Sequence, residues 1–292
     1  MKVSVVTPSF RQLEWLQLCI ASIADQEGVE VEHIIQDAGT PGFGEFAREM
    51  EKRWPNRPGY SRHMVSEPDE GMYDAVNRGL LKAKGEILSY LNCDEQYLAG
   101  TLDRVVQWFD KNSKPEVLFG DAIIVDSAGG YLCSRRAMVP QPLHTLTSGN
   151  LSIFTSSTFF RRTLRDRGIF FEKKWRVVGD AVWAVRLRRS GICCRAWGEA
   201  MAAFTETGAN LSRPETARQE QQTLYRSAPA WARWLAPLLL GIYRGRRWWA
   251  GAYRGHRVQY SIYTPKSPAR RVEFGPFRSI ARWPGREKAF HP

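Results

Sequence analysis

The sequence predicts an α/β fold in which a mainly parallel, twisted sheet is flanked by helices. Short apolar segments of strand length alternate with segments in which apolar residues recur every three or four positions, as they do on one face of a helix. The turns after two of these strands carry acidic residues, Asp37 and the pair Asp94-Glu95. Alternation of this kind favours parallel strands, because a helical crossover lets the next strand run in the same direction.

The first 91 residues supply most of the alternation. An apolar segment is closed by Pro8, and apolar positions then recur at helical spacing through Ala24. A later helix begins at Gly71, and Gly85 is expected to end it. In order along the chain, strands are expected at residues 3–7, 29–36, 62–65 and 87–91, and helices at 13–24, 45–53 and 71–84.

The second half of the chain alternates less regularly. Residues 126–130 read as a turn, because they include two glycines, an aspartate and a serine. Residues 264–292 are rich in proline, glycine and arginine and are expected to be partly disordered. Extended segments are expected at 117–125, 131–133, 153–160 and 192–197, and helices at 102–109 and 177–189.

The composition is that of an ordinary globular protein. Hydrophobic residues make up 43% of the 292 residues and charged residues 25%. No apolar run reaches the roughly 18 residues that a membrane-spanning helix needs, and Met1 is followed by a short strand instead of a signal-peptide core. The five cysteines include no Cys-x-x-Cys pair, which argues against a disulfide framework or a thiolate zinc site. We therefore expect a cytoplasmic protein.

The positive charge is concentrated in the last 82 residues. Residues 1–210 contain 26 basic and 26 acidic residues, whereas residues 211–292 contain 16 basic and 4 acidic ones, which accounts for the whole net charge of +12. Tryptophans and leucines between residues 231 and 257 are interleaved with arginines. This pattern is typical of a helix at the surface of an anionic membrane. A helical cover for the core is the alternative, and a nucleic-acid partner is disfavoured because the apolar residues cluster.

Asp94 and Glu95 are candidates for cation binding. They follow the strand at 87–91, and ligands bind at the carboxyl ends of strands in open α/β sheets. Mg²⁺ and Mn²⁺ bind carboxylate oxygens and commonly share their remaining positions with substrate phosphates. The alternative is that these acids cap a helix that follows them.

Asp37 and Asp180 are two further candidates. Asp37 follows a buried strand, where it would either bond a base or ribose or form an Asx-turn. Asp180 follows Gly179 at the start of an amphipathic segment, where it would be either the helix N-cap or a general base that accepts a proton from a hydroxyl. The five histidines lack ligand spacing and no Gly-x-Ser-x-Gly motif occurs, so neither a histidine zinc site nor a serine hydrolase is indicated.

Taken together, these segments resemble glycosyltransferase family 2, whose members have the GT-A fold. The most specific part of the resemblance is Ser66 to Glu95, which contains Asp-x-Gly-x-Tyr-Asp-Ala-x-Asn-x-Gly from Asp69 to Gly79 and ends in the acidic pair. The other matching segments are Val-Ser-Val-Val-Thr-Pro-Ser-Phe at 3–10, Ile-Ile-Gln-Asp-Ala-Gly-Thr at 34–40, and Gly179-Asp180. The resemblance covers about residues 1–215 and leaves the tail unexplained.

The resemblance implies a role for each residue that matches a family motif. The donor would be a nucleoside diphosphate sugar, with UDP as the default nucleotide. Asp94 would contact the donor ribose or the metal, Glu95 would face the metal, which would be Mn²⁺ or Mg²⁺, and Asp180 would be the catalytic base. The donor pocket would be lined by Thr7, Pro8 and Phe10 at the base, Asp37 at the base or ribose, and Asp69 and Asn77.

The chain departs from the family pattern at three positions. Glu95 stands where the second aspartate of the metal motif is usual, Glu70 where many relatives have a basic residue, and Val76 where many have an arginine. Neutralisation of the donor phosphates would then depend more heavily on the metal.

The resemblance implies a metal-dependent, inverting transfer of a sugar to a hydroxyl of a glycan or lipid-linked acceptor, as in polysaccharide biosynthesis. Residues 1–100 would form the nucleotide-sugar-binding half of one GT-A domain, residues 101–215 its acceptor-binding half, and residues 216–292 a helical, basic and aromatic extension that associates with the inner face of the cell membrane. Two alternatives stay open. One is a catalytically silent, membrane-associated scaffold, and the other is a sugar nucleotidyltransferase, although the basic glycine-rich loop that such an enzyme needs after its first strand is missing.

Overall fold

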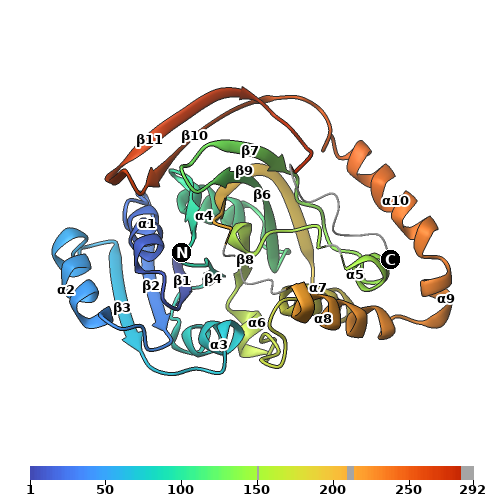
Figure 1. The fold of residues 1–292 in the computed structure, drawn as a ribbon, viewed down its shortest axis with the longest axis horizontal. Coiled ribbons are helices and arrows are strands. Elements are labelled where there is room, and N and C mark those ends of the chain that lie inside the picture. Colours follow the sequence, from blue (N-terminus) through green and yellow to red (C-terminus); the bar gives the residue numbers. More distant parts are fainter. Residues whose placement is uncertain (150, 209–213, 284–292) are drawn as a thin grey trace.

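The computed structural model describes residues 1–149, 151–208 and 214–283, and its centre is a large curled sheet (Figure 1). The strands of this sheet are β1 (Lys2–Ser9), β2 (Glu30–Asp37), β3 (Tyr60–Ser66), β4 (Ile87–Tyr90), β5 (Glu95–Tyr97), β6 (Val117–Asp126), β7 (Tyr131–Arg135), β8 (Thr158–Arg161) and β9 (Cys194–Glu206). Within the described residues their order is β3-β2-β1-β4-β8-β6-β9-β5, and β7 pairs with β6.

The two halves of the sheet differ in strand direction. The N-terminal strands β3, β2, β1 and β4 are parallel neighbours. In the second half β6 and β9 are parallel, whereas β8 is antiparallel to β4 and β6, and β5 is antiparallel to β9. The predicted α/β fold with a mainly parallel, twisted sheet is therefore confirmed, and the antiparallel pairs lie where the alternation in the sequence is less regular.

Helices cover both faces of the sheet. Seven of those described precede the C-terminal extension: α1 (Leu13–Ala24), α2 (Phe43–Arg53), α3 (Met72–Lys82), α4 (Thr101–Lys111), α5 (Pro142–Ser148), α6 (Thr163–Asp166) and α7 (Gly179–Arg189). Side chains alternate along a strand, so Val3 and Val5 of β1 pack with α1 and α4, whereas Val6 packs with α3 and α7. Burial of both faces explains why the early strands read as nearly continuous apolar runs.

Three details of the expected elements are wrong. Helix α3 ends at Lys82, so Gly85 does not terminate it. Gly85 instead permits a close backbone contact, because a Cβ there would lie 2.7 Å from the amide nitrogen of Ser4 in β1. Residues 155–157 form a 3₁₀ turn, η1 (Thr155–Ser157), in place of a strand. Strand β9 continues past residue 197 to Glu206, because it pairs with β6 along the length of that strand.

The C-terminal extension forms helices and then a β-hairpin. Its helices are α8 (Pro214–Arg226), α9 (Ala230–Trp234) and α10 (Ala236–Trp249), and its strands are β10 (Arg257–Thr264) and β11 (Ser267–Arg278). The two strands pair with each other and lie along the top of the molecule in Figure 1. No helix in the described ranges is long and apolar enough to cross a bilayer.

The hairpin is held to the main domain by apolar and ionic contacts. Tyr260 and Ile262 of β10 pack on Leu98 and on neighbouring side chains of β6 and β9. Arg271 of β11 forms a bidentate pair with Asp25 at the end of α1, with Nη2 to Oδ1 at 2.8 Å. The expected disorder is therefore wrong for β11, where an arginine that suggested disorder forms a partly buried ion pair, and residues 284–292 lie outside the described residues.

Candidate active site

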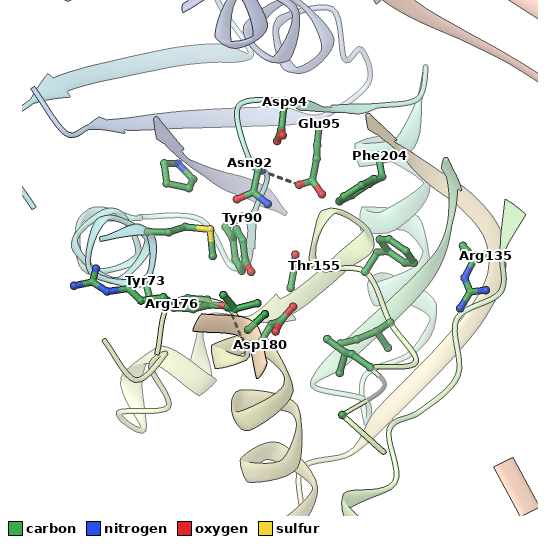
Figure 2. A pocket seen from close by; sticks show the side chains of 18 of the residues that line it. Tyr73, Tyr90, Asn92, Asp94, Glu95, Arg135, Thr155, Arg176, Asp180 and Phe204 are labelled. Atoms are coloured by element: carbon green, nitrogen blue, oxygen red, sulfur yellow. Dashed lines mark hydrogen bonds between the residues drawn. The ribbon is translucent and has the colours of Figure 1, made fainter. Parts of the chain in front are cut away.

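A cavity of about 1730 Å³ opens at the carboxyl ends of β1 and β4 (Figure 2). Pockets for small molecules usually measure about 300–1,000 Å³, so this cavity has room for more than one ligand. Its wall includes the turn after β1, the loop before α3, the turn between β4 and β5, the start of α7, and one side of α10. It therefore lies where the topology of an open α/β sheet predicts a binding site.

Asp94 lies in the tight turn between β4 and β5, and its neighbour Glu95 begins β5. The amide nitrogen of Asn92 donates to Glu95 Oε2 at 2.9 Å, and the amide nitrogen of Glu95 donates to the Asn92 carbonyl at 3.0 Å. Glu95 is the first residue of a strand, and the next helix, α4, begins after Gly100. The alternative that these two acids cap a helix is therefore wrong.

Both carboxylates of this pair are poorly solvated. Burial raises the pKa of Asp94 to about 6. Burial, followed by the charge of Asp94, raises the pKa of Glu95 to about 8. Among the described residues neither forms an ion pair with a lysine or arginine. Two adjacent acids without a cationic partner are arranged as a cation site would require.

The donor set of this turn fits a hard divalent cation. Asn92 contributes a buried Oδ1 that has no hydrogen-bond partner among the described residues, and Asn92 also lines the cavity. No group of three or more His, Cys, Asp or Glu side chains in the described ranges could form a metal cage. Mg²⁺ and Mn²⁺ do not require such a cage, since one or two carboxylates and substrate phosphates commonly suffice. An oxygen-only, incomplete set of this kind suits an ion that arrives with a phosphate ligand.

Asp180 lies on the opposite side of the pocket from Asp94 and Glu95 (Figure 2). It is the second residue of α7, and the N-cap of that helix is Val178, so the alternative that Asp180 is the N-cap is wrong. Its Oδ1 accepts a hydrogen bond from the Ala181 amide at 2.8 Å. Burial raises the pKa of Asp180 to about 6, so its carboxylate is mostly ionised at pH 7 and can still accept a proton.

Two side chains that the sequence did not single out position Asp180. The Asp180 amide donates to the Tyr73 hydroxyl at 3.0 Å, and Gly179 leaves room for the Tyr73 ring, since a Cβ there would lie 2.4 Å from Tyr73 Cε2. The carboxylate of Glu220, in α8, accepts three backbone hydrogen bonds at the start of α7, from Arg176 at 2.7 Å, Val177 at 2.8 Å and Val178 at 3.0 Å. The negative charge of Glu220 also contributes to the raised pKa of Asp180.

Four of the residues predicted to contact the donor line the cavity: Pro8, Phe10, Asp69 and Asp94. The Phe10 side chain is 52% exposed, so its ring is open to a flat ligand. Asp69 accepts a hydrogen bond from the Gly71 amide at 2.8 Å and thereby shapes the loop before α3.

Thr7, Asp37 and Asn77 are not among the residues that line the cavity, although all three were predicted to lie in the donor pocket. The Thr7 hydroxyl pairs with His33 Nε2 at 2.9 Å. Asn77 makes two hydrogen bonds with the backbone of Phe171, at 2.8 and 3.1 Å. All three side chains are buried and make their hydrogen bonds within the protein, so in this structure they support the wall of the cavity from behind.

Asp37 forms the Asx-turn that was its alternative role. Its Oδ2 accepts from the amides of Gly39 at 3.0 Å and Thr40 at 2.7 Å, and from the Ser66 hydroxyl at 2.7 Å. Its Oδ1 accepts from the Thr40 hydroxyl at 2.6 Å. The carboxylate therefore orders the turn after β2, and the neighbouring Ala38 reaches the cavity wall.

The sequence analysis also missed the arginines of the cavity, chief among them Arg135 at the end of β7 and Arg247 of α10. Their spacing carries no local signal, because they are 112 positions apart in the sequence. Only the basic composition of the tail pointed to an anionic partner.

Comparisons with known proteins agree with this geometry. The model of the family described as glycosyl transferase family 2 matches residues 4–166. A "PGL/p-HBAD biosynthesis glycosyltransferase" from Mycobacterium bovis is 28% identical over 122 residues, which are 41% of this chain and 46% of the relative. The chain thus spans about half the length of this curated relative.

Solved structures share the fold at low sequence identity. S. aureus TarS 1–349 in complex with UDP-GlcNAc has a TM-score of 0.56 at 15% identity, covering 85% of this chain and 73% of that one. The mannosyltransferase PcManGT from Pyrobaculum calidifontis, in complex with GDP-Man and Mn²⁺, has a TM-score of 0.52 at 16% identity, covering 83% and 75%. Because the family model matches more than half of its residues, this chain belongs to glycosyltransferase family 2.

Proposed function

We propose that the protein transfers a sugar from a nucleoside diphosphate sugar to a hydroxyl group of an acceptor, with inversion at the anomeric carbon. The observation that carries the proposal is the placement of Asp94-Glu95 and Asp180 on facing sides of one cavity (Figure 2). An acidic pair at one side suits a cation and a diphosphate, and a single carboxylate at the other suits a base. Family membership and two structural neighbours, one in complex with UDP-GlcNAc and one in complex with GDP-Man, support the same assignment.

The donor would bind along the turn after β1. The exposed Phe10 ring and Pro8 would contact the base, and Asp69 would shape the loop beside it. Thr7, Asp37 and Asn77 would act through the wall that they support. UDP is the nucleotide we propose first, and GDP is the competitor to test because one neighbour binds it.

The carboxylates of Asp94 and Glu95, together with the Asn92 amide oxygen, would hold Mn²⁺ or Mg²⁺. A bound divalent ion supplies positive charge next to the diphosphate leaving group. Glu95 stands in place of the usual aspartate and carries its carboxylate on a longer side chain. The backbone N–H of Asn92 donates to Oε2 of this carboxylate and fixes its position.

Asp180 would act as the catalytic base. The acceptor oxygen attacks the anomeric carbon as the bond between that carbon and the diphosphate oxygen breaks, and the acceptor proton moves to the Asp180 carboxylate. Tyr73 accepts the hydrogen bond of the Asp180 amide, and Glu220 holds the backbone just before Asp180, which keeps the carboxylate directed into the cavity. The raised pKa of Asp180, about 6, makes it a better base than an ordinary aspartate.

The proposal is tested with the Asp180→Asn variant of the full chain. We expect sugar transfer to fall at least ~100-fold, the usual scale of general-base catalysis, while UDP binding measured by thermal shift with Mn²⁺ stays unchanged. Asp110→Asn, on the exposed surface of α4, is the control and should keep full activity. Normal transfer by Asp180→Asn would rule out the base assignment, and an absence of UDP or GDP binding by the unaltered protein would favour the silent scaffold.

We also propose that α9 and α10 lie against an anionic membrane surface. Trp231, Trp234, Trp248 and Trp249 are 56–82% exposed, and arginines are interleaved with them. Interfacial tryptophans and arginines of this kind bind headgroups. The Trp234→Ser/Trp249→Ser variant should float less with phosphatidylglycerol liposomes than the unaltered chain or a Leu81→Ser control. Equal flotation of all three proteins would contradict the proposal.

A further inference from the structure

The end of the cavity that adjoins the C-terminal extension has a different chemistry from the Asp94-Glu95 side. The cavity-facing residues of α10 are Leu240, Tyr243, Arg244 and Arg247, whose spacing of three and four places them on one stripe of the helix. Arg135, at the end of β7, faces the same end of the cavity. The large exposed residues of α9 and α10 lie on other stripes, so α10 separates the cavity from the outer surface.

Arg247 is a buried cation that has no anionic partner among the described residues. It is 7% exposed, and its Nε is buried with no hydrogen-bond acceptor among the described residues. Its Nη1 makes one long contact with the Tyr243 hydroxyl, at 3.5 Å, and its guanidinium lies 5.3 Å from the ring centre of Tyr253. Aromatic rings compensate only part of the cost of removing a cation from water.

Arg135 adds a second positive charge to the same place. Its Nη1 makes one long contact with the Ala281 carbonyl, at 3.4 Å. Burial, followed by the charge of Arg247, lowers the pKa of Arg135. In the part of the chain that the structure describes, no carboxylate pairs with either arginine. Two neighbouring guanidiniums without a counter-ion raise the free energy of the protein until an anion binds between them.

The position of this pair separates it from the proposed diphosphate site. Figure 2 shows Phe204 between Glu95 and Arg135, so a phenylalanine ring separates Arg135 from the acidic pair. Arg247 lines the same cavity and lies near enough to Arg135 for its charge to act on it. In the proposed function the donor phosphates bind the cation that Asp94 and Glu95 hold. The two arginines are therefore available to bind the acceptor. A phosphate ester carries a charge close to −2 at pH 7, which matches two guanidiniums in charge and in hydrogen-bond geometry.

We propose that Arg135 and Arg247 bind a phosphate group of the acceptor substrate and thereby direct its hydroxyl toward Asp180. The proposal rests on the proposed function and deepens it, since it names the acceptor as a phosphate-bearing molecule. Soluble glycans and lipids can both carry phosphate, and the arms of the experiment below distinguish the two carriers.

The experiment is a binding titration of the full chain with the donor side saturated by UDP and Mn²⁺. Glycerol 3-phosphate, decyl phosphate and uncharged glycerol are added in separate arms and followed by calorimetry. We expect both phosphates to bind and glycerol not to bind. Arg247→Met and Arg135→Gln should each weaken phosphate binding at least about tenfold, the effect of losing one charge-assisted contact. Arg254→Gln, an exposed change of the same charge, is the control.

The melting temperature without ligand gives a second readout. If the role of Arg247 is to bind an anion, the ligand-free protein carries an uncompensated buried charge. Arg247→Met removes this charge and should raise the melting temperature. If it serves only to pack against Tyr243 and Tyr253, the same change should lower it. Tighter binding of decyl phosphate than of glycerol 3-phosphate would assign the site to a lipid phosphate, and equal binding to a soluble glycan phosphate.

Besides a lowered melting temperature of Arg247→Met, two binding results would overturn the inference. Phosphate binding that is unchanged in both variants would show that the arginines do not hold the anion. Competition between glycerol 3-phosphate and UDP would place the phosphate at the donor side instead. Both results leave the transferase proposal intact as long as UDP binds, whereas phosphate binding without any nucleotide binding would refute the transferase and leave only an anion site.

Discussion

Replacement of Glu220 by glutamine tests whether α8, outside the matched residues 4–166, controls the proposed catalytic base Asp180. The Glu220 carboxylate accepts three backbone hydrogen bonds just before Asp180, at 2.7, 2.8 and 3.0 Å. A glutamine side chain has the same shape, but one of its two acceptor atoms becomes a donor. At least one of the three amides would then face an N–H group in place of an oxygen.

The size of the effect follows from these contacts. A hydrogen bond to a charged group is worth about 1.5–3 kcal/mol. Glu220 is partly exposed, so water can satisfy a freed amide, and we expect a net loss of ~1 kcal/mol in stability and a fall of about three- to tenfold in kcat. The charge of Glu220 is one of the causes that raise the pKa of Asp180, so its removal lowers that pKa.

The assay is the pH dependence of kcat/KM for Glu220→Gln, compared with the unaltered protein and with Glu215→Gln. A base must be deprotonated to act, so the rate rises through the pKa of Asp180, which is about 6. A lower pKa moves this rise to lower pH. Glu215 is exposed on the same helix and contacts Gln219, so its change should leave the profile alone. A profile of Glu220→Gln that does not move, or moves to higher pH, would refute the reasoning.

Two further predictions concern residues on either side of the cavity wall. Burial and Asp94 raise the pKa of Glu95 to about 8, so between about pH 4.5 and 8 the folded state holds a proton that the unfolded state has released, and metal-free stability should fall as pH rises through this window. In thermal melts, Glu95→Gln should remove the contribution of Glu95 to this loss of stability with rising pH. It should also abolish the stabilisation by Mn²⁺ with UDP. A metal-free stability profile identical to that of the unaltered protein would contradict the raised pKa of Glu95. Asn77→Leu leaves the backbone amide and carbonyl of Phe171 without their hydrogen-bond partner. The free energy of unfolding in urea should fall by about 2–3 kcal/mol, and the KM for the donor should stay unchanged. A rise in that KM at normal stability would instead indicate that Asn77 contacts the donor.

The sequence was sufficient for features that depend on neighbours along the chain. The parallel first half was predictable because the residues of β1, β2 and β4 are buried on both faces and their apolar runs are continuous. The position of Asp94 and Glu95 at the cavity was predictable because they follow such a strand directly, and strand ends in this topology meet at one edge.

The sequence did not distinguish polar side chains that are free to bind a ligand from those that form hydrogen bonds within the protein. Asp37 and Asn77 lie in motif positions as clearly as Asp94 does, yet their hydrogen bonds are made to Thr40, Ser66 and Phe171. Hydrogen bonds of this kind depend on which segments the fold brings within about 3 Å, and no local pattern encodes that distance.

Only the tertiary structure determined which part of the protein each side chain of the C-terminal extension contacts. Arginines of this one segment have three different environments. Arg271 of β11 pairs with Asp25, Arg254 after α10 is exposed, and Arg247 of α10 lines the cavity. Local propensity specifies that a segment is helical or extended, but the partner of each face is set by long-range packing of the whole chain. The acidic side of the cavity was therefore predictable from the sequence. Its basic side became visible only in the fold, where α10 packs on α5 and Arg247 comes near Arg135 of β7.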